Sequence, residues 1–248
     1  MSRWAEDWTG LRAVGDAPPL KAIPLANEAS LTLSAELGLR HDAYDNAGMT
    51  QRGSYAESNG RGLVGADLRF NPTIRVYAEV GTAGIDRWPG DAPANFRNDA
   101  ALQQLFVEGR SHLGSMLVGA MIGRQEFADG PNLRRTWNGV SLYAHGRNFR
   151  IGAFDLRSMR LAPGWFDEGI DDGVGLYGLN ASFIVSPGCG GTNIYLDPFW
   201  YHTTNPTYRS GGRSGLDARD TYGFRARGRR HTVSFDWTIA RQTGRYID

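Results

Sequence analysis

Apolar and polar residues alternate one by one through much of this 248-residue chain. The pattern is clearest from Leu31 to Arg40, where aliphatic side chains stand at every odd position and polar residues or glycine at every even one. Successive side chains of a β-strand point to opposite faces, whereas a helix repeats about every 3.6 residues. The segment therefore predicts a strand with one apolar and one polar face. Residues 64–70 and 74–80 repeat the pattern around an Asn71-Pro72 turn.

Alternation of this kind predicts about eleven strands and no amphipathic helix. The predicted strands cover residues 31–40, 64–70, 74–80, 101–110, 116–126, 136–145, 149–157, 174–186, 193–202, 219–228 and 231–241. Short turns alternate with long loops along the chain. The short turns are 71–72, 112–115, 146–148, 187–191 and 228–230, and the long loops are 45–60, 82–98, 127–135, 158–173 and 203–218. This order predicts an up-and-down meander, and its asymmetry is typical of outer-membrane barrels.

Two environments produce strands with one apolar and one polar face. A soluble sandwich buries the apolar face, whereas a membrane barrel turns it to lipid. Several runs reach the roughly 9 to 11 residues that cross a bilayer, against a usual 5 to 6 or so in soluble sheets. We therefore predict an all-β, antiparallel, up-and-down transmembrane β-barrel or partial barrel of about 10 to 12 strands. Aromatic residues near strand ends fit an interfacial girdle: Tyr44, Trp88, Trp137, Trp200 and Tyr246.

Composition excludes other classes. The 27 basic residues balance 26 acidic ones, so no nucleic-acid partner is expected. The longest apolar run, Met116–Ile122, is far shorter than the roughly 20 residues of a spanning helix. Met1–Trp8 has no basic start followed by an apolar core, so we expect no signal peptide in this chain. We expect one barrel domain, with residues 1–28 as a periplasmic N-terminal segment and 29–248 as barrel strands.

No motif predicts catalysis, a metal or a cofactor. The GxGxxG at Gly173–Gly178 opens an alternating strand and does not lead into a helix. The five histidines have no ligand spacing, GxSxG is absent, and the single Cys189 lies among glycines. The acidic residues within 167–172 lack EF-hand spacing, so a solvated loop is favoured over a Ca²⁺ site. We expect that the protein is not an enzyme.

The stretch Gly123–Gly139, GRQEFADGPNLRRTWNG, concentrates arginine around a predicted turn. Lys21 is the only lysine in the chain, so arginine carries nearly all of the positive charge. The planar guanidinium group binds carboxylates in a bidentate manner. A surface lined by arginines that are interleaved with Glu and Asp would attract a carboxylate-bearing polymer without trapping it.

This stretch resembles the alginate export family of bacterial outer-membrane barrels, whose pattern is GPNxRRxFDG. Trp137 and Asn138 stand where that family tends to have Phe and Asp. The likeness extends along the whole chain. It rests on GRQE (Gly123–Glu126), GPNLRR (Gly130–Arg135) with the following WNGVSL, RWAEDW (Arg3–Trp8), LKAIPL (Leu20–Leu25) and DDGVGLYG (Asp171–Gly178).

The resemblance implies an outer-membrane channel whose arginine-rich, electropositive lumen passes an anionic exopolysaccharide such as alginate. Its partners would be this polysaccharide, outer-membrane lipid and periplasmic export proteins. We expect arginines to contact the substrate and glutamates to orient them as counter-charges. These substrate-binding residues are Arg40, Arg69, Arg75, Arg110, Arg124, Arg134 and Arg135, with Glu36, Glu79, Glu108 and Glu126.

The strand count separates this chain from the family, whose barrels have of the order of 16 to 18 strands. About eleven predicted strands, with no aromatic-ended last strand, indicate either an N-terminal portion that lacks the C-terminal strands or a smaller closed barrel. A truncated product without function is a further reading. The alternative function is a soluble all-β carbohydrate-binding protein or polysaccharide-acting enzyme, because Glu36, Glu79 and Glu108 also supply paired carboxylates.

Overall fold

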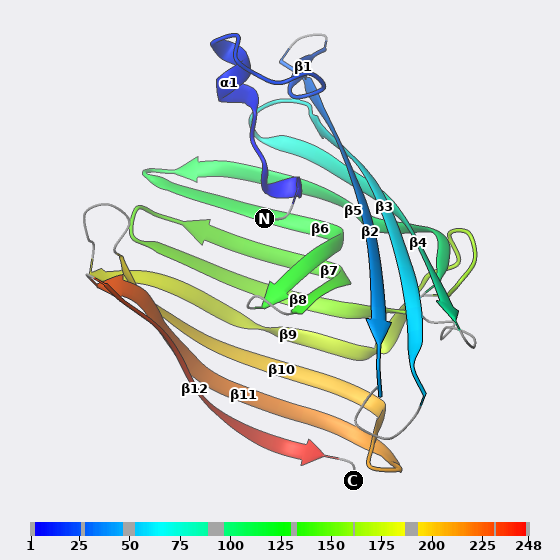
Figure 1. The fold of residues 1–248 in the computed structure, drawn as a ribbon. Helices are drawn as coiled ribbons and strands as arrows, with labels where there is room; N and C mark the ends of the chain where they lie inside the picture. The colour runs from blue at the N-terminus through cyan, green and yellow to red at the C-terminus, as the bar shows by residue number, and fades with distance from the viewer. Residues whose placement is uncertain are drawn as a thin grey trace. The chain divides into compact units, whose positions relative to one another are not determined.

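The structure, a computed structural model, describes residues 3–25, 28–46, 53–88, 97–129, 133–160, 162–186, 193–230 and 232–246; the side chains of 3, 128, 129, 133–135 and 230 are not described. It is an all-β protein in which twelve strands form one antiparallel sheet in chain order (Figure 1). The strands are β1 (Ile23–Pro24), β2 (Ser30–Tyr44), β3 (Tyr55–Arg69), β4 (Ile74–Trp88), β5 (Asn98–Leu113), β6 (Met116–Asp129), β7 (Leu133–His145), β8 (Phe149–Arg160), β9 (Gly169–Ser186), β10 (Ile194–Ser210), β11 (Arg213–Arg230) and β12 (Val233–Tyr246).

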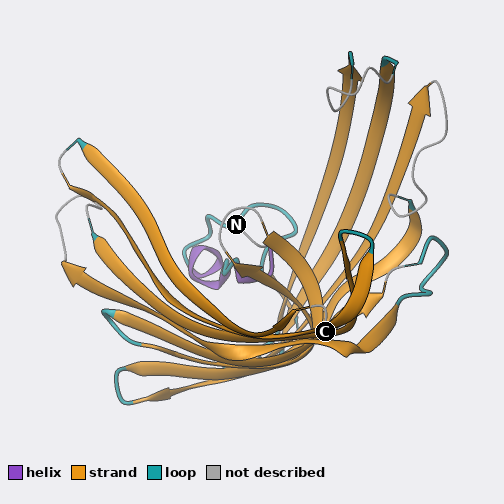
Figure 2. Cartoon of the chain, turned by 90° about the horizontal axis from the view of Figure 1, so that it is seen from below, coloured by secondary structure: helices purple, strands orange, loops and turns teal. Residues whose placement is uncertain are grey.

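Among the described residues, helical structure occurs only in the N-terminal segment, which contains η1 (Arg3–Ala5) and α1 (Thr9–Ala13) (Figure 2). Within the described part of the chain, no helix has the length and hydropathy needed to cross a membrane. The eleven predicted strands are confirmed as β2–β12. The additional β1 is a two-residue strand that pairs Ile23 with Leu31 and Pro24 with Ser30.

Several strands are longer than their side-chain pattern predicts. The predicted loop 203–218 is wrong, because β10 and β11 pair as far as Ser210 and Arg213. Gly211 and Gly212 form the turn with φ of 57° and 78°, the positive values that a tight two-residue hairpin requires. Likewise β3 already begins at Tyr55 and β4 continues to Trp88. Backbone pairing continues beyond the point where apolar alternation stops, because ladder hydrogen bonds do not depend on side-chain polarity.

The chain divides into two compact units. Unit 1 comprises residues 1–107, 124–136 and 159–169, and unit 2 comprises residues 108–123, 137–158 and 170–248. Unit 1 therefore holds β1–β4, the first part of β5, the tip of the β6–β7 hairpin and the β8–β9 connection. Each unit is described below by itself.

In unit 1 the cross-strand register sorts side chains onto two faces. Val64 of β3 lies opposite Ala35 and Val80, on an apolar face. This face is exposed: Val64 is 63% exposed and Leu39 is 79% exposed. Asp67, three residues further along β3 and so on the other face, is 5% exposed. Exposed aliphatic residues and buried charged ones are the reverse of the distribution in water-soluble proteins. We call the second face the polar face.

Unit 2 has the same two faces. Leu179, Trp200 and Tyr222 lie side by side on β9, β10 and β11, on an apolar face whose Leu179 is half-exposed. On the opposite face Arg225 forms an ion pair with Asp236. All twelve strands belong to one sheet.

The predicted aromatic girdle holds only in part. Trp88 ends β4 on the apolar side and is strongly exposed, and Trp200 also lies on the apolar face. Trp137 is buried, so its assignment to the girdle is wrong. Tyr44 packs on Tyr55 of the polar face, and the Arg219 guanidinium lies over the Tyr246 ring. The alternation of side chains along each strand determines which face an aromatic residue lies on. Its position at the end of a strand does not.

Gly139 of β7 has a φ of 155°, and a Cβ atom there would meet the Asp155 carbonyl oxygen of β8 well inside contact distance. We expect Gly139→Ala to lower the free energy of unfolding by about 1 to 3 kcal/mol. The temperature at which the folded band disappears in heat-modifiability gels would measure the loss. Gly109→Ala is the matched control, because a Cβ there meets open space. Equal transitions for the two variants would contradict the argument.

Candidate functional site

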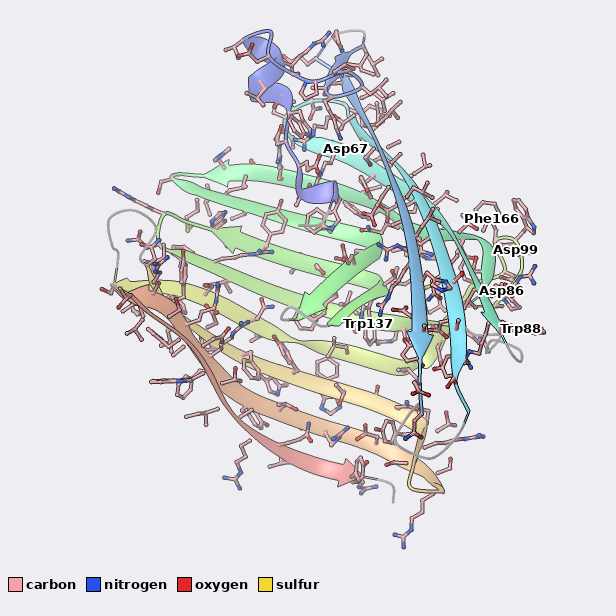
Figure 3. The ribbon with its side chains drawn as sticks, viewed as in Figure 1. Asp67, Asp86, Trp88, Asp99, Trp137 and Phe166 are labelled. Carbon is pink, nitrogen blue, oxygen red and sulfur yellow. The ribbon has the colours of Figure 1, made fainter. Side chains whose placement is uncertain are left out.

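The most buried charged cluster of unit 1 is centred on Asp67 of the polar face (Figure 3). Arg69 and Arg75 lie directly opposite each other on β3 and β4. Asp67 Oδ2 accepts from Arg69 Nε at 3.0 Å and from Arg75 Nη1 at 3.4 Å. All three side chains are less than a tenth exposed. The cluster thus places two guanidinium groups around one carboxylate, whose Oδ1 atom has no hydrogen-bond partner among the described residues.

The N-terminal segment covers this cluster. Arg69 donates from Nη1 to Asp7 Oδ2 at 2.5 Å and from Nη2 to the Glu6 carbonyl at 3.0 Å. Arg75 donates from Nη1 to the Trp4 carbonyl at 2.6 Å. Burial alone would raise the pKa of Asp7, but hydrogen bonds from Thr9 and the neighbouring Arg69 guanidinium together lower it below its usual value. Asp7 is therefore held as a carboxylate against the arginine pair.

A stack of aromatic and acidic side chains continues the polar face along β4 and β5. The Tyr77 and Phe106 rings stack with centroids 5.5 Å apart. Glu79 accepts hydrogen bonds from the Tyr77 hydroxyl at 2.9 Å and from Gln104 Nε2 at 3.3 Å. In unit 2, Glu108 accepts a hydrogen bond from the Tyr143 hydroxyl. The predicted glutamates Glu79 and Glu108 are thus buried and hydrogen-bonded.

Toward the ends of β2–β4 that lie away from the N-terminal segment, the polar face carries a ladder of ion pairs. Arg61 pairs with Glu36. Arg87 pairs with Glu57 at 2.9 Å, and Arg40 with Asp42 at 2.6 Å. Arg40 and Arg61 are well exposed, at 72% and 60% of their side-chain surface. These guanidinium groups are accessible to a ligand, in contrast to Arg69 and Arg75.

Segment 124–126 of β6 forms two hydrogen bonds with β5. The Glu126 amide donates to the Gln104 side-chain oxygen at 3.3 Å, and Arg124 Nη1 donates to the Leu102 carbonyl at 2.6 Å. At Ala100 the β5 backbone is also hydrogen-bonded to the β8–β9 connection. The Ala100 amide donates to the Gly164 carbonyl, and the Phe166 amide donates to the Ala100 carbonyl.

Glu168 connects β5 with Arg124 of β6. Its Oε1 atom accepts from the Leu102 amide at 2.8 Å and from Arg124 Nη1 at 2.7 Å, and its side chain is 4% exposed. Burial would raise the pKa of Glu168, but backbone amides of Glu168 and Leu102 and the Arg124 guanidinium lower it. Glu168 belongs to the acidic stretch 167–172. No group of three or more potential metal ligands occurs within the described part of the chain.

In unit 2 the polar face of β10–β12 carries further arginine–aspartate pairs. Arg227 Nε donates to Asp197 Oδ2 at 2.6 Å, and Arg227 also stacks over the Tyr195 ring. Arg219 holds Asp217 with two nitrogen atoms, a bidentate contact. With the Arg225–Asp236 pair, β11 presents three arginines whose charges are balanced locally by aspartates of β10, β11 and β12.

The predicted site residues fall into distinct groups. Arg69 and Arg75 lie together, and Arg40 and Glu36 belong to the exposed ladder. Arg110 is half-buried on β5, away from these groups in sequence. Glu126 is half-buried, and Arg134 and Arg135 lie in β7 with side chains outside the described set. Sequence reasoning missed Arg61, Arg87, Glu57, Asp7 and Glu168 as site residues. Counting every second residue back from Asp67 finds Arg61, whereas the contacts of Asp7 and Glu168 have no sequence signal.

A model of the alginate export family matches residues 30–248, which is most of the chain. The chain belongs to the alginate export family. Members of this family are outer-membrane β-barrels that transport polysaccharide, so this member of the family is not an enzyme. No curated protein matches the chain. The family resemblance drawn from GRQE and GPNLRR is therefore confirmed, and both motifs lie within the matched residues.

Proposed function

We propose that this alginate export family protein is an outer-membrane channel that passes an anionic exopolysaccharide, such as alginate, along its polar face. The observation that carries the proposal is the reversed distribution of polarity. Val64 and Leu39 are exposed on one face, while Asp67 and Arg75 are buried on the other. Such a sheet is suited to lipid on its apolar side and to a wet, arginine-rich lumen on its polar side.

The exposed ladder gives the chemistry for polymer passage. Arg40 and Arg61 can each hold a uronate carboxylate through a planar pair of N–H donors. Each also has its own carboxylate partner, Asp42 or Glu36, to which it returns when the polymer moves on. Exposed ion pairs of this kind are worth only about 0 to 1 kcal/mol, so exchange between partners is cheap. Conduction requires binding that is favourable but weak and repeated at several sites.

The two faces and the turns of the sheet also indicate which parts of the chain meet the periplasm and the lipid. Short turns of outer-membrane barrels face the periplasm, and the turn between β3 and β4 lies beside the N-terminal segment through Arg69 and Asp7. We place residues 1–28 on the periplasmic side, where export partners would meet the channel, and residues 29–248 in the barrel domain. The apolar face contacts outer-membrane lipid.

Charge selectivity in planar bilayers tests the proposal. Arg40→Gln with Arg61→Gln removes two positive charges from the polar face, and we expect the anion-over-cation permeability ratio to fall several-fold. The matched control is His41→Glu with Ser58→Glu, because these neighbours lie opposite each other on the apolar face of the same two strands. The control changes the net charge equally and should leave the ratio unchanged. Equal ratios for both double variants, or a wild-type protein without anion preference, would contradict the proposed function.

A further inference from the structure

The apolar face of β11 and β12 in unit 2 becomes basic toward one end. The register places Ile239 beside Phe224 on this face, and Trp237 lies two residues before Ile239 on the same side. Ile239 and Trp237 are exposed, at 65% and 69%. The next row on this face pairs Arg241 with Tyr222, so a cation directly follows an apolar and aromatic band.

Three exposed residues of β12 continue this face, namely Arg241, Thr243 and Arg245. Alternate side chains of a strand share one side, so the three present two guanidinium groups and a hydroxyl together. Among the described residues, neither arginine has an ion pair or a side-chain hydrogen bond. Their donors are therefore available to an anion outside the chain.

The carboxylate that lies nearest to these arginines in the register is bound by other groups. Asp220 lies opposite Thr243. Its Oδ1 atom accepts a hydrogen bond from Trp200 Nε1 at 3.0 Å and lies 3.0 Å from His202 Nδ1. Because Asp220 is engaged by Trp200 and His202, the two positive charges of β12 remain for an external partner.

The basic end of this face lies at the outer end of the strands in the proposed orientation. In one antiparallel sheet in chain order, all even-numbered strands run in the same direction. β4 begins at the β3–β4 turn, which the proposed function places on the periplasmic side, so β12 ends on the opposite side. The inference below rests on that function, because it takes the apolar face to lie in the outer membrane.

Exposed arginines at the edge of the hydrocarbon attract anionic lipid headgroups, and a guanidinium group binds phosphate through two parallel donors. Residues four apart on a strand are separated by about 13 Å, so two phosphates of one headgroup lie within reach of the two long side chains. We propose that Arg241, Thr243 and Arg245 bind the headgroup of a bisphosphorylated glycolipid of the outer leaflet. The acyl chains of this lipid lie along Ile239 and Trp237.

Native mass spectrometry of the detergent-solubilised protein with bisphosphorylated lipid A tests the site. We expect Arg241→Gln with Arg245→Gln to weaken binding about ten- to thirtyfold, the contribution of two arginines close to an anionic lipid. Lipid A with one phosphate should bind the wild type more weakly, because it engages only one of the two arginines. Phosphatidylglycerol, which has a single phosphate and no sugar, should bind more weakly than bisphosphorylated lipid A.

Arg40→Gln with Arg61→Gln is the matched control, since it removes two positive charges from the polar face. This control should leave the affinity for lipid A unchanged. Conversely, the Arg241→Gln and Arg245→Gln protein should keep the wild-type anion-over-cation permeability ratio, because these arginines lie outside the proposed lumen.

Trp237 provides a second measurement, which locates the acyl chains. It lies four residues before Arg241 on the same exposed face. In phosphatidylcholine vesicles, we expect lipid A with brominated chains to quench tryptophan fluorescence more than brominated phosphatidylcholine does. Trp237→Phe should remove most of this excess quenching.

Equal affinity of the wild type and the Arg241→Gln, Arg245→Gln protein for lipid A, with anion preference retained, would overturn the lipid site and leave the channel function intact. Equal affinity of the wild type for phosphatidylglycerol and lipid A would overturn the bisphosphorylated ligand. A wild type without anion preference, whose tryptophans brominated phosphatidylcholine does not quench, would overturn both proposals.

Discussion

Replacing Val64 by arginine is expected to lower the free energy of unfolding by about 2 to 4 kcal/mol in lipid, the cost of a cation near the middle of a membrane-facing strand. Val64 lies on the apolar face and is 63% exposed, so the substitution creates no clash in the core. In a water-soluble protein the same exposed position would tolerate arginine within about 0.5 kcal/mol. Urea unfolding in phospholipid vesicles measures the difference.

Ser58→Arg provides the control for position along the strand. Ser58 lies on the same face of β3, six residues closer to its start, opposite His41 and Asp86. The cost of arginine falls to about 0 to 1 kcal/mol near the membrane interface, and Asp86 can also pair with it. Similar small effects at both positions would mean that the apolar face does not meet hydrocarbon.

Replacing Arg124 by glutamine is expected to cost about 3 to 5 kcal/mol, because it leaves the buried Glu168 carboxylate without its cation. One oxygen of Glu168, Oε2, already has no hydrogen-bond partner among the described residues. The loss should appear first in the contact of the β8–β9 connection with β5. Hydrogen exchange at the Ala100 and Phe166 amides, which are bonded across this contact, measures it locally.

Glu168→Gln is the conservative counterpart and should cost less, since the amide oxygen can still accept from Leu102 and Arg124. The lowered pKa of Glu168 also determines how stability depends on pH. The contribution of Glu168 to stability is present above the ordinary carboxyl pKa and is lost as pH falls through the lowered pKa of the folded state. Glu168→Gln should remove that part of the acid sensitivity. Combining both glutamines should recover part of the Arg124→Gln loss. Strictly additive effects would show that the two side chains do not interact.

The strands could be predicted from sequence because alternation is a local property. Leu31–Arg40 alone specifies both faces of β2, and the Gly211-Gly212 pair was a usable hairpin signal that the loop prediction overlooked. The residues at which strands end were harder to predict. Arg87 lies in a predicted loop, yet it continues β4 and pairs with Glu57 because backbone pairing extends past the alternating region.

The site was predicted less completely than the fold. Arg69, Arg75 and Arg40 were assigned to the polar face from their strand positions, and the register places them there. Their accessibility could not be predicted, because Arg69 is covered by Asp7, 62 residues away in the chain. Arg124 similarly meets Glu168 across 44 residues. No local spacing encodes contacts between segments that far apart.

The amino-acid order by itself determined that this member of the alginate export family is a meander of strands and which side chains share a face, because a period of two is a property of neighbouring residues. Only the tertiary structure decided which of those arginines are exposed, as Arg61 is, and which are buried, as Arg75 is in contact with Trp4 and Asp67. The reason is physical: a guanidinium group takes whichever oxygen the path of the chain brings within reach, and that path depends on strand register and on how the N-terminal segment and the β8–β9 connection are placed.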